Sequence, residues 1–248
     1  MEFHILWGGM LATGGCTLLG ALPAMLVRTV THRFKDMLLA YTAGIMVTAS
    51  IYSLIPSALE MSNLTILCLG VLTGTLMLTL LEYLIPHHDL DHQLPVRGPH
   101  VERGTILFIS AMALHNLPEG LSVGVSFASA DMELAAVVSF AIGLQNIPEG
   151  ALIAFYLLAS HVRRRYALLL TACTGLMELV AFLAGYSFSQ SVDRFVPYGL
   201  AFAAGAMLFI VYKELIPESH GDGHERIATF AFMAGLLSMI IMTHLLES

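Results

Sequence analysis

Two short motifs of the same pattern carry the side chains best suited to chemistry. One segment reads HNLPEG (residues 115–120) and another reads QNIPEG (residues 145–150). Residues four apart share one face of a helix, so His115 lies over Glu119 and Gln145 lies over Glu149 if both segments are helical. Imidazole, carboxylate and carboxamide groups then line one face of each helix, which is a ligand set for a metal ion.

The surroundings of these motifs favour a bound cation. The proline of each motif lacks an N–H, so one carbonyl of the preceding turn is left for a cavity, water or ion to satisfy. A carboxylate inside a membrane costs about 2.5–3.5 kcal/mol on insertion scales. No Lys or Arg lies mid-span to pair with Glu119, Glu149 or Glu178. A divalent cation would neutralise them, and these donors suit a first-row ion such as Zn²⁺.

The composition indicates that these motifs lie in a membrane. Of 248 residues, 57% are apolar and 12% are charged, against about a quarter charged in an ordinary soluble domain. Mean hydropathy is +0.78. The net charge of −7 gives no basic surface for nucleic acid. The three cysteines are scattered and form no CxxC pair, which argues against a disulfide framework and against a thiolate zinc site.

Eight apolar segments are long enough to cross a bilayer, for which a helix needs about 20 residues. They are Ile5–Val27, Met37–Leu59, Met61–Leu81, Gly104–Ala130, Leu134–Ser160, Tyr166–Ser191, Phe195–Tyr212 and Ile227–Leu246. The first begins without a basic region or an evident cleavage site, so we expect it to be retained as a helix. The sequence therefore predicts an all-α integral membrane protein with eight transmembrane helices, forming a single polytopic domain over residues 1–248.

The basic residues predict the orientation of these helices. Loops one, three, five and seven contain nine of the eleven Lys and Arg residues: Arg28, Arg33, Lys35, Arg97, Arg103, Arg163, Arg164, Arg165 and Arg226. The opposite side holds Arg194, and Lys213 lies near the inner end of the seventh helix. Because basic loops remain in the cytoplasm, both termini are expected outside a cell membrane.

An internal repeat relates the second and seventh helices. AGIM (43–46) and SLIP (53–56) recur 161 residues later as AGAM (204–207) and ELIP (214–217). With eight spans these two helices run in opposite directions, which indicates an inverted-topology repeat, a common plan of transporters. Chance similarity between two apolar helices rich in Gly and Ala is the alternative.

Taken together, the paired motifs on consecutive helices of an eight-span chain resemble the ZIP family of divalent-metal transporters, in its bacterial GufA-type branch. The resemblance runs along nearly the whole chain. It implies metal ligands at His115, Asn116, Glu119, Gln145, Asn146 and Glu149, a second-metal carboxylate at Glu178 and a thioether ligand at Met46. Some relatives carry His at the position of Gln145 and Asp at that of Asn146, so a second metal should be held less tightly here.

The resemblance also implies how such a chain works. Zn²⁺, with Fe²⁺, Mn²⁺, Cd²⁺ and Co²⁺ as further candidates, would be the transported substrate and not a cofactor, and it would move into the cytoplasm. A five-plus-three arrangement of helices, elevator-like alternating access and a homodimer in the lipid bilayer are implied as well. No nucleic acid partner is expected.

Two cytoplasmic segments offer weaker candidate ligands. The loop at 86–103 contains His87, His88, Asp89, Asp91, His92 and His100, and the loop before the last helix contains Glu218, His220, Asp222 and His224. Such tracts either bind metal, as an acceptor or sensor, or are simply solvated loops. Glu82 and Glu214 either line the inner exit of the route or mark the membrane boundary.

Two other classes of protein remain as alternatives at this point. An intramembrane metal-dependent hydrolase also needs His and Glu within its spans, but it normally shows an HExxH pair or a three-ligand site with an open position. This chain has no HExxH. A metal sensor or structural membrane protein would not need two near-duplicate sites on proline-containing helices. We therefore expect a transporter and not an enzyme.

Overall fold

The computed structural model describes residues 7–26, 31–84, 103–129, 131–192, 195–221 and 223–246, and within these every regular element is a helix. The elements of the first half are η1 (Leu11–Gly15), α2 (Cys16–Ala21), α3 (Pro23–Leu26), α4 (His32–Thr48), η2 (Ala49–Leu54), α5 (Ile55–Glu60) and α6 (Leu64–Leu84). Those of the second half are α7 (Arg103–Ala128), α8 (Met132–Ala159), α9 (Arg164–Ser191), α10 (Phe195–Ile210), η3 (Val211–Leu215), α11 (Ile216–Ser219) and α12 (Glu225–Leu246). The η elements are π-helical turns within longer helices.

Seven stretches are long and apolar enough to cross a membrane. They are Trp7–Leu26, His32–Glu60, Leu64–Tyr83, Met132–Ala159, Arg164–Ser191, Phe195–Ser219 and Glu225–Leu245. The helix α7, which carries the first motif, is not among these seven, although its 26 residues extend for about 39 Å at 1.5 Å per residue. The prediction of a helical, multi-pass membrane protein is confirmed.

Polar residues define where several helices begin. The side chain of Thr31 accepts a hydrogen bond from the Phe34 amide at the start of α4. Asp131 accepts from the amides of Glu133 and Leu134 at the start of α8. These contacts satisfy amides that the first turn of a helix leaves unpaired.

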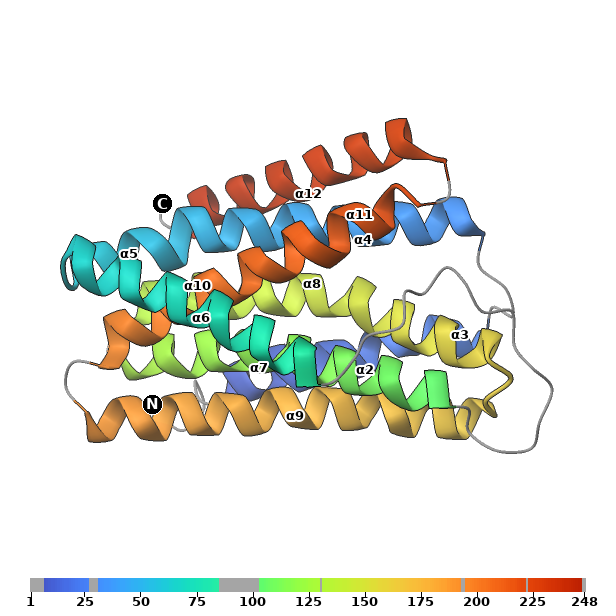
Figure 1. Cartoon of the computed structure of the whole chain (residues 1–248), viewed down its shortest axis with the longest axis horizontal. Coiled ribbons are helices and arrows are strands. Elements are labelled where there is room, and N and C mark those ends of the chain that lie inside the picture. Colours follow the sequence, from blue (N-terminus) through green and yellow to red (C-terminus); the bar gives the residue numbers. More distant parts are fainter. Residues whose placement is uncertain are drawn as a thin grey trace.

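The helices run along one axis of the molecule, and four pairs of them are in close contact (Figure 1). The pairs are α2 with α8, α9 with α7, α4 with α12, and α10 with α6. Glycines make this proximity possible: a Cβ at Gly150 would clash with the carbonyl oxygen of Thr17, and one at Gly120 would clash with that of Glu178. Small residues at such contacts let backbones approach within a membrane.

These contacts repeat with the offset seen in the sequence. Thr17 and Glu178, which are 161 residues apart, contact the equivalent glycines of the two motifs. The π-helical turns also repeat: with the offset of 161 residues, η3 (Val211–Leu215) corresponds to residues 50–54, which lie in η2. The segments α4–α5 and α10–α11 run in opposite directions along the bundle (Figure 1). Equivalent positions of the repeat, Thr17 on α2 and Glu178 on α9, therefore pack in the same way, the first against the second motif helix and the second against the first.

Apolar side chains fill the interior and also cover the outside. Met46, Phe182, Leu200 and Met207 are buried in the main core cluster. Large apolar residues are exposed along α6 and α12: Leu64, Leu69, Leu72, Leu76, Leu80 and Tyr83 on the first, and Phe230, Met233, Leu237, Ile241 and Leu245 on the second. An apolar exterior over the length of these helices matches a surface that faces lipid.

Candidate metal site

The two motifs lie in the middle of α7 and α8 and are withdrawn from solvent. His115, Asn116 and Glu119 are buried on α7, and Gln145, Asn146 and Glu149 are buried on α8. Pro118 and Pro148 lie inside their helices without interrupting them. The sequence predicted that these six side chains share a region of the bundle, and the structure brings the two helices together.

A hydrogen bond connects the two motifs directly. The Gln145 Nε2 group donates to Glu119 Oε1 at 2.5 Å. An amide N–H pointed at a carboxylate is a charge-assisted contact, among the stronger hydrogen bonds in proteins. The second motif thus supplies a partner for the carboxylate of the first.

Glu178 joins this region from α9 and is completely buried. Its Oε1 accepts from Asn146 Nδ2 at 2.6 Å, and its Oε2 accepts from Thr17 Oγ1 at 3.2 Å. The Asn146 amide also donates to the carbonyl oxygen of Thr13, in the π-helical turn η1, at 3.3 Å. Four segments of the chain therefore meet at one polar region: the first helix, α7, α8 and α9.

The three carboxylates are near enough to interact electrostatically. Glu119 experiences the charges of both Glu149 and Glu178, and His115 and Glu149 interact as well. Clustered buried carboxylates repel one another unless protons or cations intervene. A divalent cation in this region would relieve that repulsion.

Several oxygens of the motifs have no hydrogen-bond partner. Among the described residues, these buried atoms include Asn116 Oδ1, Glu119 Oε2, Gln145 Oε1, Asn146 Oδ1 and Glu149 Oε1. Leaving a buried polar group unsatisfied costs roughly 1–3 kcal/mol, and native structures contain few such groups. Five unpartnered oxygens on two adjacent motifs form the donor set that a cation would satisfy.

The side chains are not arranged as a complete metal site. Within the part of the chain that the structure describes, no three His, Cys, Asp or Glu side chains converge as ligands. Instead, the amides of Gln145 and Asn146 point their N–H groups at Glu119 and Glu178. Rotation of each amide would exchange its NH₂ for its oxygen, so the same residues can pair with the carboxylates or bind a cation.

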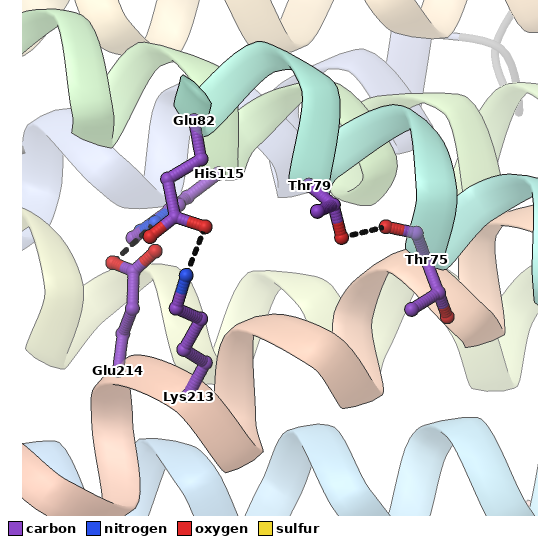
Figure 2. A network of polar contacts seen from close by, with 6 residues as sticks. All are labelled: Thr75, Thr79, Glu82, His115, Lys213 and Glu214. Carbon is purple, nitrogen blue, oxygen red and sulfur yellow. Dashed lines mark hydrogen bonds and ion pairs between the residues drawn. The ribbon is translucent and has the colours of Figure 1, made fainter. Parts of the chain in front are cut away.

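His115 has a partner outside the motifs. Its Nε2 lies 2.8 Å from Glu214 Oε2, which belongs to the π-helical turn η3 (Figure 2). The neighbouring Lys213 forms an ion pair with Glu82 at the end of α6. A line of ionisable side chains therefore extends from the first motif toward one end of the bundle.

The remaining predicted ligands lie outside the polar region formed by the two motifs and Glu178, or outside the described residues. Met46 is buried among apolar side chains of the main core. His220 Nδ1 contacts the carbonyl oxygen of Ile216, and His224 Nδ1 lies 3.1 Å from Asp36 Oδ2. The loop candidates His87, His88, Asp89, Asp91, His92 and His100, together with Asp222, lie outside the described residues.

Sequence reasoning missed Thr17 and the backbone of Thr13 as partners of the site. Thr17 precedes Glu178 by 161 residues, which is the repeat offset, so the repeat itself was the signal that could have identified it. The carbonyl of Thr13 carries no such signal, because every residue has one.

Comparison with known proteins places the chain in a family. A family model described as ZIP Zinc transporter matches residues 86–243. The chain is 37% identical to "Zinc transporter ZIPB" of Bordetella bronchiseptica over 240 residues, covering 91% of this chain and 76% of the relative. It is 37% identical to "Zinc transporter GufA" of Myxococcus xanthus over 246 residues, covering 94% and 95%. "Zinc transporter ZupT" of Chlorobium luteolum is 28% identical over 94% of this chain.

A family match over more than half of the chain agrees with the buried His, Glu and amide groups in the middle of an apolar helical bundle. Relatives of similar length align along nearly all of it. The chain belongs to the ZIP zinc transporter family.

Proposed function

We propose that this protein transports Zn²⁺, and other divalent ions of the first transition row, into the cytoplasm through the two motifs of α7 and α8. The observation that carries this proposal is the set of five unpartnered buried oxygens, three from amides and two from the interacting carboxylates of Glu119 and Glu149. Such groups are costly to bury and gain most from a cation. Relatives named zinc transporters support Zn²⁺ as the substrate.

The residues of the site have distinct roles in this proposal. Glu119 and Glu149 supply the negative charge, His115 supplies an imidazole, and Gln145 supplies an amide oxygen. Asn116 and Asn146 are further metal ligands, Glu178 helps to hold a second ion, and Met46 adds a thioether ligand, as the resemblance to the family implies. When no ion is present, the amides bind the carboxylates, and an arriving ion replaces those hydrogen bonds.

We further propose that the chain crosses the membrane eight times and that both termini lie outside. In this topology α7 is a span in addition to the seven stretches named above, and it is the fourth in chain order. Two features support this topology. The last helix ends at the end of the bundle where the first described helix begins (Figure 1), as an even number of crossings requires. Helices α4, α7, α9 and α12 begin at the opposite end, near Arg33, Lys35, Arg163, Arg164, Arg165 and Arg226, so that end faces the cytoplasm.

The architecture of the proposed transporter is an inverted repeat in a single domain over residues 1–248. The matching glycine contacts and π-helical turns of the two halves support it. Such repeats place the substrate site near the middle of the bilayer. We include the homodimer in this proposal, with its lipid-facing surface on the exposed apolar residues of α6 and α12.

Transport into sealed vesicles tests this function. Purified protein in proteoliposomes should load an internal Zn²⁺-sensitive dye when Zn²⁺ is added outside, and empty liposomes should not. The Glu119→Ala protein, reconstituted in the same amount, is the matched control. Equal dye signals from the wild type and from empty liposomes would contradict the proposal, as would hydrolysis of a peptide substrate without ion flux.

A further inference from the structure

We propose that Lys213 is a tethered cation that keeps Glu82 from binding the transported metal, and that it thereby sets how readily the inner end of the route releases its ion. This inference rests on the proposed function. Its basis is the ion pair between Lys213 Nζ and Glu82 Oε2, beside the contact between His115 and Glu214 (Figure 2).

The pair lies at the boundary between membrane and water. Tyr83 and Tyr212, the sequence neighbours of the two partners, are 86% and 81% exposed. Tyrosines concentrate at the headgroup level of a membrane. Glu82 lies at the end of the span Leu64–Tyr83, and the side chains of Glu82 and Lys213 are 20% and 46% exposed. The ammonium also lies 5.4 Å from the centre of the Phe209 ring, a cation–π contact that helps to position it.

Three potential metal ligands approach this place from three segments of the chain. His115 comes from α7, Glu214 from η3 and Glu82 from the end of α6. Imidazole nitrogens and carboxylate oxygens both bind Zn²⁺. In the structure only His115 and Glu214 contact each other, because Lys213 holds the third group. This agrees with the lack of a converged three-ligand cluster among the described residues.

The chemical consequence concerns release. A transporter needs a site that an ion can leave, and a site with three strong ligands at the exit would retain it. One turn of η3 supplies both Glu214, which draws the ion out of the motifs, and Lys213, which neutralises the next carboxylate. The alternative is that the ion pair merely ties α6 to η3. An exposed pair of this kind contributes little to stability.

Single and double variants separate these two interpretations. If Lys213 prevents trapping, Lys213→Met should retain more Zn²⁺ in detergent, about one additional ion per chain, and release it more slowly. We expect release slower by about ten-fold, since removing a unit charge close to a divalent cation changes its binding at least that much. Glu82→Gln should not retain more metal, and the double variant should release Zn²⁺ as fast as Glu82→Gln.

The matched controls use the same end of the molecule. Lys213→Arg keeps the positive charge and should restore normal release. Lys35→Met removes the only other lysine, which lies in the first turn of α4, and should leave retention unchanged. Binding is measured by equilibrium dialysis and release by a stopped-flow chelator assay, each with the purified full-length protein.

The result that overturns the inference is equal behaviour of the two single variants. If Lys213→Met and Glu82→Gln change release in the same direction and the double variant is no worse, the pair is only a structural tie. The exchanged pair, Glu82→Lys with Lys213→Glu, guards against misfolding, because it restores the contact and should release Zn²⁺ normally. Failure of the wild type to transport Zn²⁺ would instead contradict the proposed function, and that outcome is read from the vesicles alone.

Discussion

The two motifs are near-duplicates in sequence, yet their side chains have different partners. In the second motif, Gln145 and Asn146 both donate to carboxylates, those of Glu119 and Glu178. In the first motif, His115 contacts Glu214, away from the other motif, and the amide atoms of Asn116 have no hydrogen-bond partner. The amides of the second motif therefore bind the buried carboxylates, whereas the histidine of the first motif contacts η3.

The surrounding helices account for this difference. Glycines of the two motifs contact Thr17 and Glu178, which occupy equivalent positions of the repeat. Only one of these two positions is acidic, so only Asn146 has a carboxylate opposite it. Likewise Ser53 in the first half matches Glu214 in the second. The two similar motifs therefore have different hydrogen-bond partners because different residues of the packed helices lie opposite them.

The carboxylate of each motif should be indispensable, whatever the other differences between the motifs. Glu119→Ala or Glu149→Ala removes both a ligand and a charge, so Zn²⁺ uptake into vesicles should fall to the level of empty liposomes. Glu133→Ala, at the exposed start of α8, serves as the control and should transport normally. Near wild-type uptake by both variants would move the site elsewhere.

Glu178 tests whether the asymmetry between the halves makes a second metal site. Glu178→Ala should lower bound Zn²⁺ toward one ion per chain and reduce uptake without abolishing it, because the motifs retain their own ligands. Thr17→Val removes only its hydrogen bond to Glu178 and should have a smaller effect on both quantities. An unchanged metal count together with unchanged flux for Glu178→Ala and Glu178→Gln would remove this residue from the site.

The imidazole of the first motif should make binding depend on pH. Metal must displace protons from His115 and from the carboxylates, so Zn²⁺ affinity should fall as the pH is lowered. The fall should lie between about pH 7 and pH 5, where imidazole and carboxylic acids begin to bind protons. His115→Gln, which makes the first motif match the second, should flatten the upper part of this profile. A flat wild-type binding curve measured by calorimetry over this range would contradict the expectation.

The smallest effect is expected from the histidine-bearing loop at 86–103, which contains no residue of the two motifs. Replacing His87, His88, His92 and His100 together by Ser should leave substantial Zn²⁺ uptake, because none of them belongs to the two motifs. Intracellular metal handling, followed with a cytosolic Zn²⁺ reporter, is the quantity that should change. Complete loss of vesicle uptake by a folded variant would place the loop in the transport route.

Sequence patterns were sufficient to predict a helical, multi-pass membrane protein, whereas the six motif residues remain predicted ligands. Apolar length predicted the helices, and the spacing of four predicted that His115 and Glu119 share a face. Tertiary partners were beyond these patterns, because periodicity says which face a residue occupies and not what lies opposite. Nothing in the sequence indicates that His115 contacts Glu214 while Gln145 turns to Glu119. The choice depends on which helices pack against each motif.

The partner of Glu82 illustrates the same limit. Its position near the end of a span is compatible with either a boundary residue or an exit ligand, and both interpretations follow from one hydropathy profile. Lys213 lies 131 residues away, and only the packing of α6 on α10, the helix that leads into η3, brings the two charges together.

The π-helical turn η3 (Val211–Leu215) has a consequence for the length of its helix. A π-helical turn accommodates one more residue than an α-helical turn. Deleting one residue there would allow a regular α-helix in which the later side chains keep their faces, but it would rotate side chains within the turn by up to about 100°. Glu214 and Lys213 would then no longer face α7 and α6. The number of residues in this turn is therefore constrained as well as their types. A single deletion there should reduce Zn²⁺ transport more than any one alanine substitution within the turn.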